Sequence, residues 1–251
     1  DGHMLEEGIN EAGAMSAWIA LATSYSTNAL PMIPFYIYYS MFGFQRVGDL
    51  VWAAGDMQAQ GFLLGGTAGR TTLNGEGLQH QDGHQLILFN TVHNCVTYDP
   101  CYGYELAVIM QDGLRRMYAE GERVFYYITL MNENYEQPAM PVGVEEGIKK
   151  GMYLLSDNGS KQVQLLGSGV ILREVEKAAK ILAEEFNITA NVWSVTSFNE
   201  LTREGMACDE YNRLHPLEEP RTPWITEQLA QHEGIVVAAT DYMRIFSEQI
   251  R

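Results

Sequence analysis

The 251-residue sequence has few cysteines, few positive charges and no long apolar run. Its three cysteines form a sparse, odd-numbered set, which fits a reducing compartment better than a disulfide framework, so we expect a cytoplasmic protein. Cys95 and Cys101 lie six residues apart with no second pair nearby, so we expect no zinc site. No run of about 18 uncharged apolar residues occurs, and Asp1-Gly2-His3 does not resemble the start of a secretory signal. We therefore expect neither a membrane-spanning helix nor an exported protein.

Positive charge is scarce relative to negative charge. The 16 Lys and Arg residues stand against 32 Asp and Glu residues, which gives a formal net charge of -16. A chain of this charge repels nucleic acid and anionic membranes, so we expect neither as a partner. An anionic substrate would have to be held by a few local cations, because the overall field opposes its approach.

Hydrophobic residues make up 46% of the chain, which is ample for one large or two modest cores. Segments typical of strands alternate with segments of helical pattern. The expected strands are 33–39, 62–66, 124–130, 163–166, 188–195 and 235–240, and the expected helices are 11–22, 42–54, 100–118, 170–186, 222–231 and 242–250. The first of these strands is dense in aromatic and β-branched residues, so we expect it to be buried. This alternation predicts an α/β fold of two doubly wound three-layer α/β/α units with mostly parallel sheets.

Two segments fall outside the alternation. The stretch 132–144 is polar and contains two prolines, which is typical of a linker, so we divide the chain into domains 1–137 and 138–251. The stretch 67–84 is a long, glycine-rich and polar loop without periodicity. Loops of this length inside a compact domain are more often functional than not.

The amino-terminal stretch 6–15 has the sequence Glu-Glu-Gly-Ile-Asn-Glu-Ala-Gly-Ala-Met. Glu11 begins the first expected helix, whose next turns are too apolar to face water, so its carboxylate is expected where solvent is scarce. Burial favours the protonated form of a carboxylate unless a partner holds its charge, which suits a group that shares a proton with a ring nitrogen of a cofactor. The simpler interpretation is a first-turn glutamate that the helix dipole favours.

This stretch resembles the glycine-isoleucine-x-glutamate signature of the pyrimidine-binding domain in thiamine-diphosphate enzymes of the transketolase group. The segments 22–27, 31–46 and 73–80 narrow the resemblance to the homodimeric pyruvate dehydrogenase first component, over essentially the whole chain. In that family the glutamate at the position of Glu11 contacts the aminopyrimidine ring nitrogen. A bulky apolar residue at the position of Ile9 holds the cofactor bent.

Tyr39, Phe42 and Arg46 are the next candidates. Their spacing of three and four places them on one face if the strand gives way to a helix at Ser40. A flat pyrimidine needs an aromatic face, and such a contact is worth roughly 0.5–1.5 kcal/mol beyond burial. Aromatic residues at the end of a strand are usually core; the resemblance implies instead that Tyr39 and Phe42 line the pyrimidine pocket and that Arg46 supports it.

The loop after the second strand contains His80 and His84. Two histidines four apart on a helix could bind a metal, but three nearby glycines argue against a helix. The family places its substrate-facing histidine at the position of His80, which together with Glu11 would be catalytic, and Glu76 and Asp82 could tune it. The alternative is an exposed turn with an incidental histidine.

One expected motif is missing. The family binds the diphosphate and Mg²⁺ through Gly-Asp-Gly, whereas Gly48-Asp49 and Gly55-Asp56 lack the second glycine. We therefore expect an excerpt: the pyrimidine domain plus most of a C-terminal domain, with diphosphate and Mg²⁺ bound mainly by an absent upstream domain. Gly167-Ser168-Gly169 before a helix looks like a phosphate cradle, but a lone GxG is a weak signal, and a strand–helix turn is favoured.

The resemblance implies thiamine-diphosphate-dependent oxidative decarboxylation of pyruvate, with acetyl transfer to a lipoyl group on the acetyltransferase of the complex. It also implies a homodimer with the active site at the dimer interface. A transketolase-type ketol transfer would need cations for a sugar phosphate near His80, and Arg70 is the only one nearby in the sequence. A non-catalytic assembly or binding fragment is the third possibility.

Overall fold

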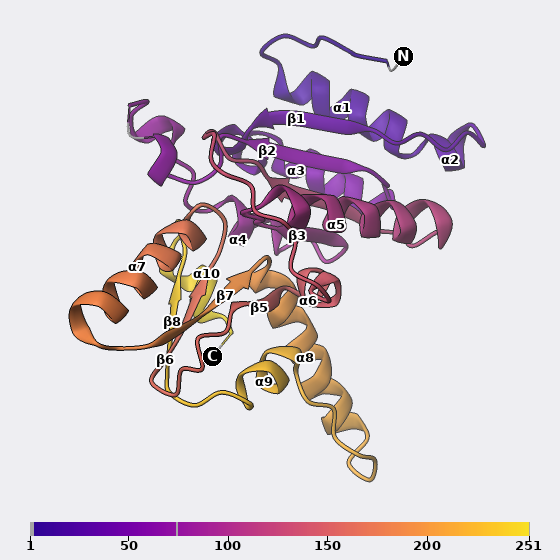
Figure 1. The fold of residues 1–251 in the computed structure, drawn as a ribbon. Coiled ribbons are helices and arrows are strands. Elements are labelled where there is room, and N and C mark those ends of the chain that lie inside the picture. The colour runs from indigo at the N-terminus through magenta and orange to yellow at the C-terminus, as the bar shows by residue number, and fades with distance from the viewer. Residues whose placement is uncertain (1–2, 74, 251) are drawn as a thin grey trace.

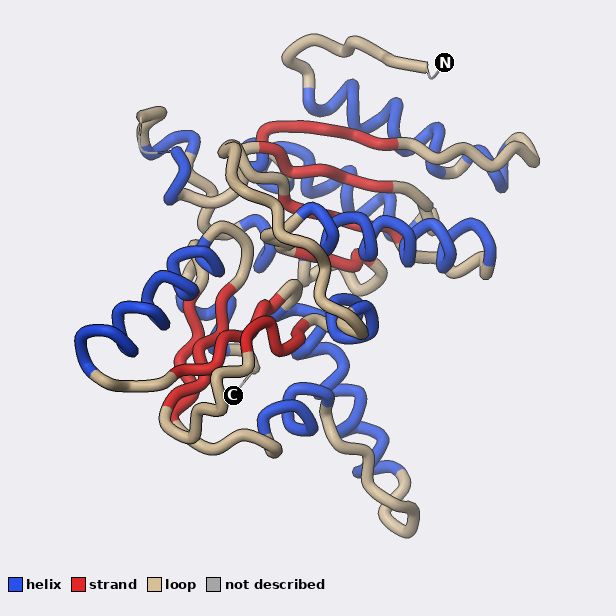
Figure 2. The backbone as a smooth tube through the Cα atoms, in the orientation of Figure 1, coloured by secondary structure: helices blue, strands red, loops and turns tan. Residues whose placement is uncertain are grey.

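The computed structural model describes residues 3–73 and 75–250, and Asn74 of the candidate loop lies outside the described residues. The chain forms two layered α/β units, each around a four-stranded sheet (Figures 1 and 2). The first sheet is wholly parallel, in the order β1-β2-β4-β3. Its strands are β1 (Phe35–Tyr39), β2 (Phe62–Gly66), β3 (Cys95–Tyr98) and β4 (Phe125–Thr129).

Helices cover both faces of this sheet. On β2, Leu63 packs in one cluster, with residues of α1 and α3, while Phe62 and Leu64 pack in another, with residues of α5. Burial on both faces is what a parallel sheet requires, and it explains why β2 is apolar at successive positions. The helices of this unit are α1 (Glu11–Ala22), α2 (Ser24–Thr27), α3 (Phe44–Asp56), α4 (Gln85–Phe89) and α5 (Gly103–Leu114), the last followed by a π-helical turn (Arg115–Ala119).

The second unit has the sheet order β5-β7-β6-β8, with β5 antiparallel to β7 and the other pairs parallel. Helix α7 packs on one face of this sheet, whereas α8 and α10 pack on the side that joins the first unit. Its elements are α6 (Glu145–Lys150), β5 (Met152–Ser156), β6 (Val163–Gly167), α7 (Ile171–Phe186), β7 (Ala190–Val195), α8 (Phe198–Leu214), α9 (Trp224–Leu229), β8 (Ile235–Ala239) and α10 (Arg244–Glu248).

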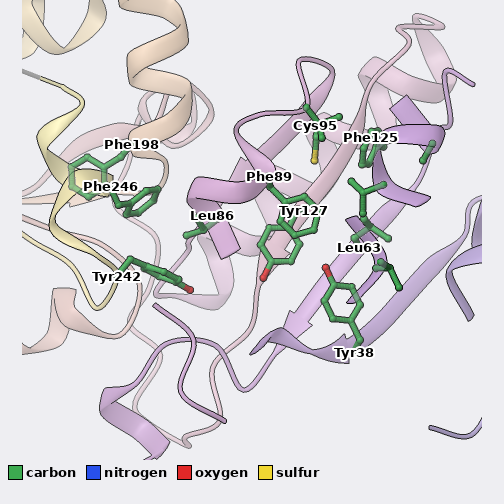
Figure 3. Packing of buried hydrophobic residues seen from close by; sticks show 14 of the residues in the cluster. Tyr38, Leu63, Leu86, Phe89, Cys95, Phe125, Tyr127, Phe198, Tyr242 and Phe246 are labelled. Carbon is green, nitrogen blue, oxygen red and sulfur yellow. The ribbon is translucent and has the colours of Figure 1, made fainter. Parts of the chain in front are cut away.

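One hydrophobic cluster runs through both units (Figure 3). Tyr127 of β4 stacks on Phe89 of α4, with ring centroids 3.9 Å apart. Phe198 of α8 meets Phe246 of α10 edge to face at 5.2 Å, and all four side chains belong to the same buried set. Because apolar burial is the main stabilising term, a shared core ties the two units into one body.

The alternation of strands and helices expected from the sequence is present, but one expectation needs correction and two elements were not predicted. The segment 33–39 was expected as a buried strand, whereas β1 is an edge strand on which Phe35 and Ile37 are 45% and 66% exposed. Strand β5 was not predicted, and neither was α8, whose buried side chains are few among many charged residues. Residues 131–144 contain neither helix nor strand. Within the described parts of the chain, no helix combines the length and the apolar content needed to cross a bilayer.

The two sheets meet through the carboxyl ends of their strands. The Asp99 N–H, just after β3, donates to the carbonyl oxygen of Thr196, just after β7, at 2.7 Å. Gly169 follows β6 with a φ of +51°, and a Cβ there would lie 2.6 Å from the Asp99 carboxylate oxygens. Glycine is therefore needed on both counts. The Gly167-Ser168-Gly169 motif is a strand–helix turn that receives a side chain of the first unit.

Candidate functional site

Glu11 lies in the first turn of α1. Asn10 caps this helix, since its side-chain oxygen accepts a hydrogen bond from the Gly13 N–H at 3.1 Å. The Glu11 side chain is 20% exposed and forms an ion pair with Arg46 of α3. Arg46 is therefore a partner that stabilises the charged form of this carboxylate. The sequence alone did not show whether Glu11 has such a partner.

A short turn after β1 brings the aromatic candidates together. A 3₁₀ turn (Ser40–Phe42) follows Tyr39 directly, and α3 begins two residues later. The Tyr39 and Phe42 rings lie 5.6 Å apart between centroids, and the Arg46 guanidinium carbon is 4.1 Å from the Phe42 centroid. The strand-to-helix change at Ser40, on which the spacing argument depended, is present. Glu11, Arg46, Phe42 and Tyr39 therefore form one continuous group.

His80 completes this group from the loop after β2. Its ring centroid lies 5.1 Å from that of Tyr39 and 5.7 Å from that of Phe42. Its Nδ1 is 3.1 Å from the carbonyl oxygen of Glu76 and 3.6 Å from the Glu76 carboxylate. The Tyr39 hydroxyl donates to the same carboxylate. Partial burial, followed by this hydrogen bond, raises the pKa of Tyr39. The five residues Glu11, Tyr39, Phe42, Arg46 and His80 are named below as the aromatic cluster.

A buried polar layer supports the aromatic cluster. Asp82 is fully buried, accepts the Ser40 hydroxyl, and accepts the His84 and Gln85 N–H groups at 3.0 Å each. The Gln85 side-chain oxygen accepts the Phe44 N–H at 2.7 Å. Asp82 therefore joins the turn after β1 to the loop that carries His80, a connecting role that differs from tuning of His80.

Sequence reasoning missed Ser40 and Gln85 as parts of this layer. Asp82 lies just before α4, whose N-cap is His84, and a short acidic side chain at such a position commonly accepts backbone N–H groups two and three residues on, which is a usable signal for Asp82. Nothing local points to Ser40, because its partner lies 42 residues away.

Two candidates lie apart from the cluster. Ile9 is 97% exposed. His84 has its N–H bonded to Asp82, and its ring lies beside Gln85 with 3.4 Å between the nearest side-chain nitrogens. Over the described ranges, no three His, Cys, Asp or Glu side chains are grouped as metal ligands. One hollow of the structure is lined by the β3–α5 connection and the linker, and another by residues near Asn94; neither includes a residue of the aromatic cluster.

The arrangement of the two sheets defines the class of protein. The transketolase of Campylobacter jejuni matches 98% of this chain and 33% of its own chain, with a TM-score of 0.73 at 19% identity. At this identity the likeness concerns the fold, which is transketolase-like α/β with mostly parallel sheets, as expected from the sequence.

The family model for the middle domain of the pyruvate dehydrogenase E1 component matches residues 1–138. The model for the transketolase-like C-terminal domain matches residues 151–251. The chain belongs to the pyruvate dehydrogenase E1 component family. This confirms the resemblance drawn from the sequence motifs.

Curated relatives match the whole chain. The pyruvate dehydrogenase E1 component of Pseudomonas aeruginosa is 64% identical over 253 residues, and that of Escherichia coli K12 is 63% identical over 253 residues. Each match covers 100% of this chain but 29% and 28% of the relative, respectively. The chain thus spans less than a third of the length of the curated relatives it matches.

Proposed function

We propose that this chain supplies the pyrimidine side of a thiamine-diphosphate site. The parent protein would catalyse oxidative decarboxylation of pyruvate and acetyl transfer to a lipoyl group on a partner acetyltransferase. The observation that supports this most strongly is the aromatic cluster itself. Side chains from the start of α1, the end of β1, the start of α3 and the loop after β2 meet at one surface. They combine one carboxylate, flat aromatic faces and one imidazole, which is the chemistry that an aminopyrimidine and a small keto acid require.

Each residue of the cluster has a distinct task in this proposal. Glu11 holds and returns a proton at the ring nitrogen of the pyrimidine, as a positioned carboxylate can when it lies within hydrogen-bond reach of the ring. Arg46 holds the charge of Glu11 while no pyrimidine is present. Tyr39 and Phe42 present ring faces for stacking. His80 donates to a carboxylate or carbonyl oxygen of the substrate.

The cofactor, when bound, supplies the electron sink for the carbanion chemistry, and the chain supplies geometry and proton control. In this proposal the diphosphate and Mg²⁺ are held mainly by another domain of the parent protein. Ile9 would contact the cofactor when that domain covers it. The cytoplasmic location expected from the cysteine usage is part of the same proposal.

A second copy of the chain is the proposed partner at this surface. Phe35 and Ile37 share one face of the edge strand β1 and are exposed, which is unfavourable in an isolated unit and typical of an interface. A homodimer that covers β1 would also bring a second protomer close to the aromatic cluster, which begins at the end of the same strand.

The ketol-transferase alternative is less well supported. A sugar phosphate needs cations, and the side chain of Arg70, the cation near His80 in the sequence, already donates from Nε to the backbone carbonyl of Asp241 at 2.7 Å. Pyruvate carries a single carboxylate and needs fewer cations. Measuring carbon dioxide release from pyruvate against ketol transfer from a ketose phosphate in the parent protein separates the two activities.

Glu11→Gln in the parent protein is the decisive variant. It should lower carbon dioxide release on the order of 10²–10⁴-fold, since a positioned proton-transfer group contributes about that much. Glu210→Gln, which alters an exposed ion pair with Arg213 on α8, is the matched control and should change nothing. Turnover unaffected by Glu11→Gln would contradict the proposed role.

The isolated 251 residues provide a second test. Titration with thiamine diphosphate and Mg²⁺ should show weak binding, because the charged diphosphate contributes much of the affinity and is held elsewhere. The isolated chain should not turn over pyruvate, and robust carbon dioxide release would refute that. Dimer formation without any cofactor binding would favour the assembly-fragment alternative.

A further inference from the structure

The loop that carries His80 is closed at its base and open at its tip. The Asp82 N–H donates to the carbonyl oxygen of Gly69 at 3.0 Å, so the two ends of the loop meet. The described residues between them include Glu76 and His80 and lie mostly at the surface. This loop also contacts the turn after β1, where Tyr39 donates to Glu76 and Ser40 donates to Asp82. Binding at the base of a loop limits where the rest of the loop can lie.

Asp241 of the second unit binds this base. Its Oδ2 accepts the Arg70 N–H at 2.6 Å and the Thr71 N–H at 2.7 Å. Its Oδ1 accepts the Thr71 hydroxyl at 2.7 Å, and its backbone carbonyl accepts Arg70 Nε–H at 2.7 Å. Asp241 is 8% exposed, and hydrogen bonds to a carboxylate out of water are among the stronger ones in proteins.

The second unit contacts the loop at both of its ends. Gly69 has a φ of +80°, and a Cβ at this position would lie 2.6 Å from Asp241 Oδ2, so a side chain here would push the base away. At the other end, the Met243 N–H donates to the carbonyl oxygen of Gly83 at 2.8 Å. Residues 241–243, which follow β8, therefore hold both ends of the loop.

We propose that Asp241 is a positioning residue for His80: by binding Arg70 and Thr71, it sets the loop so that the imidazole lies against Tyr39 and Phe42. The second unit thereby serves the aromatic cluster without contributing a side chain to it. This inference rests on the proposed function only for what His80 does to the substrate. The placement of His80 is a property of the chain and is measurable without cofactor.

The test follows the imidazole protons of His80 by NMR in the 251-residue chain, assigned with His80→Gln. The ring lies 5.1 Å from Tyr39 and 5.7 Å from Phe42 between centroids, so ring currents should displace these protons from their values in a free histidine. Asp241→Ala should abolish the displacement. Asp241→Asn should retain most of it, because its amide oxygen still accepts both N–H groups and its amide can donate to the Thr71 hydroxyl.

Two controls separate positioning from general loosening of the structure. His232 packs edge to face on Trp193 at 5.0 Å within the second unit, and its signals should stay unchanged in every variant. Ser194→Ala removes the buried 2.6 Å hydrogen bond from Ser194 to Glu105 between the units and leaves the loop base intact. It should not move the His80 signals.

Unchanged His80 signals in a folded Asp241→Ala chain would overturn the inference, as would an equal loss in Ser194→Ala. If Asp241→Ala does not fold, Gly69→Ala decides, because it disturbs the same contact from the loop side. Loss of the ring-current displacement of His80 in this variant supports positioning, and an unchanged displacement refutes it. A failure to bind thiamine diphosphate would count against the proposed function and leave this result standing.

Discussion

The aromatic cluster differs from the contact between the two units, which is called the joint below and includes Glu105, Tyr153, Ser194 and Asp99. The two regions differ in which partners hydrogen-bond to their polar groups. In the joint, Glu105 is fully buried and accepts the Ser194 hydroxyl at 2.6 Å, the Tyr153 hydroxyl at 2.7 Å, and the N–H groups of Cys101 and Tyr102. In the aromatic cluster, the side chain of Arg46 is 46% exposed and that of Glu11 20%. The joint is closed to water, whereas the cluster is open to it.

This difference indicates which region stabilises the fold and which is available for chemistry. A buried acceptor that loses its donors, or buried donors that lose their acceptor, cost the desolvation of each unpaired group. An exposed ion pair contributes little, because water and salt replace it readily. Substitutions in the joint should therefore act on stability, and substitutions in the cluster should act on binding and catalysis.

Glu105→Ala should have the largest effect on stability. It leaves the Ser194 hydroxyl and the N–H groups of Cys101 and Tyr102 without their acceptor, whereas Tyr153 keeps the Tyr104 hydroxyl as a partner at 2.7 Å. We therefore expect a loss of about 3 kcal/mol or more in the free energy of unfolding. Urea denaturation measures it. Glu174→Ala, an exposed glutamate on α7 paired with Lys177, is the control and should cost less than about 0.5 kcal/mol. Equal effects of the two substitutions would remove the contrast between joint and surface.

Asp99 should make the joint sensitive to pH. Burial raises the pKa of Asp99 from 3.8 to about 7; the carboxylates of Asp241 and Asp82 add to this, while the Thr129 and Ser168 hydroxyls oppose it. The folded state therefore favours the protonated acid more than the unfolded chain does. The contribution to stability is fully present below about pH 4 and is lost as the pH rises to about 7, by up to about 4 kcal/mol in total.

Asp99→Asn tests the prediction that stability falls as the pH rises. The amide keeps an oxygen to accept the Thr129 hydroxyl, which now donates to Asp99 at 2.6 Å, and it carries no charge at any pH. Relative to the unsubstituted chain, the variant should gain roughly 2–3 kcal/mol in unfolding free energy between about pH 5 and pH 8. Thermal unfolding at several pH values provides the measurement. A difference between the two chains that is independent of pH would show that Asp99 does not titrate in this range.

Much of the fold was predictable because its signals are local. Strand β2 was predicted with its observed bounds, since an apolar run between polar segments identifies a buried strand. That β1 is an edge strand was not predictable, because strand order depends on tertiary topology. Helix α8 was missed because its buried residues, Phe198, Leu201 and Cys208 among them, form a narrow stripe between charged residues.

Some contacts of the site were likewise predictable from local sequence, whereas others depend on the folded chain. The spacing of Tyr39, Phe42 and Arg46 was sufficient to place them together, since one short turn connects them. The ion pair of Arg46 with Glu11 joins residues 35 apart, and the hydrogen bonds of Asp241 to Arg70 span 171. No periodicity reports contacts at such separations, so only the folded chain reveals them. The division into domains at residue 137 stays a prediction.

Glu11→Gln should have a smaller effect on stability than the substitutions of Glu105 and Asp99. Its ion pair with Arg46 is accessible to water, so we expect a change of less than about 1 kcal/mol in the free energy of unfolding, vanishing near 1 M salt, where charges are screened within about 3 Å. Denaturation at low and high salt measures this, with Arg46→Met as the partner variant. A loss comparable to that of Glu105→Ala would mean that the carboxylate is part of the structural framework. A negligible loss of stability, together with the large loss of turnover expected for the same substitution, would instead show that Glu11 is needed for catalysis and not for folding.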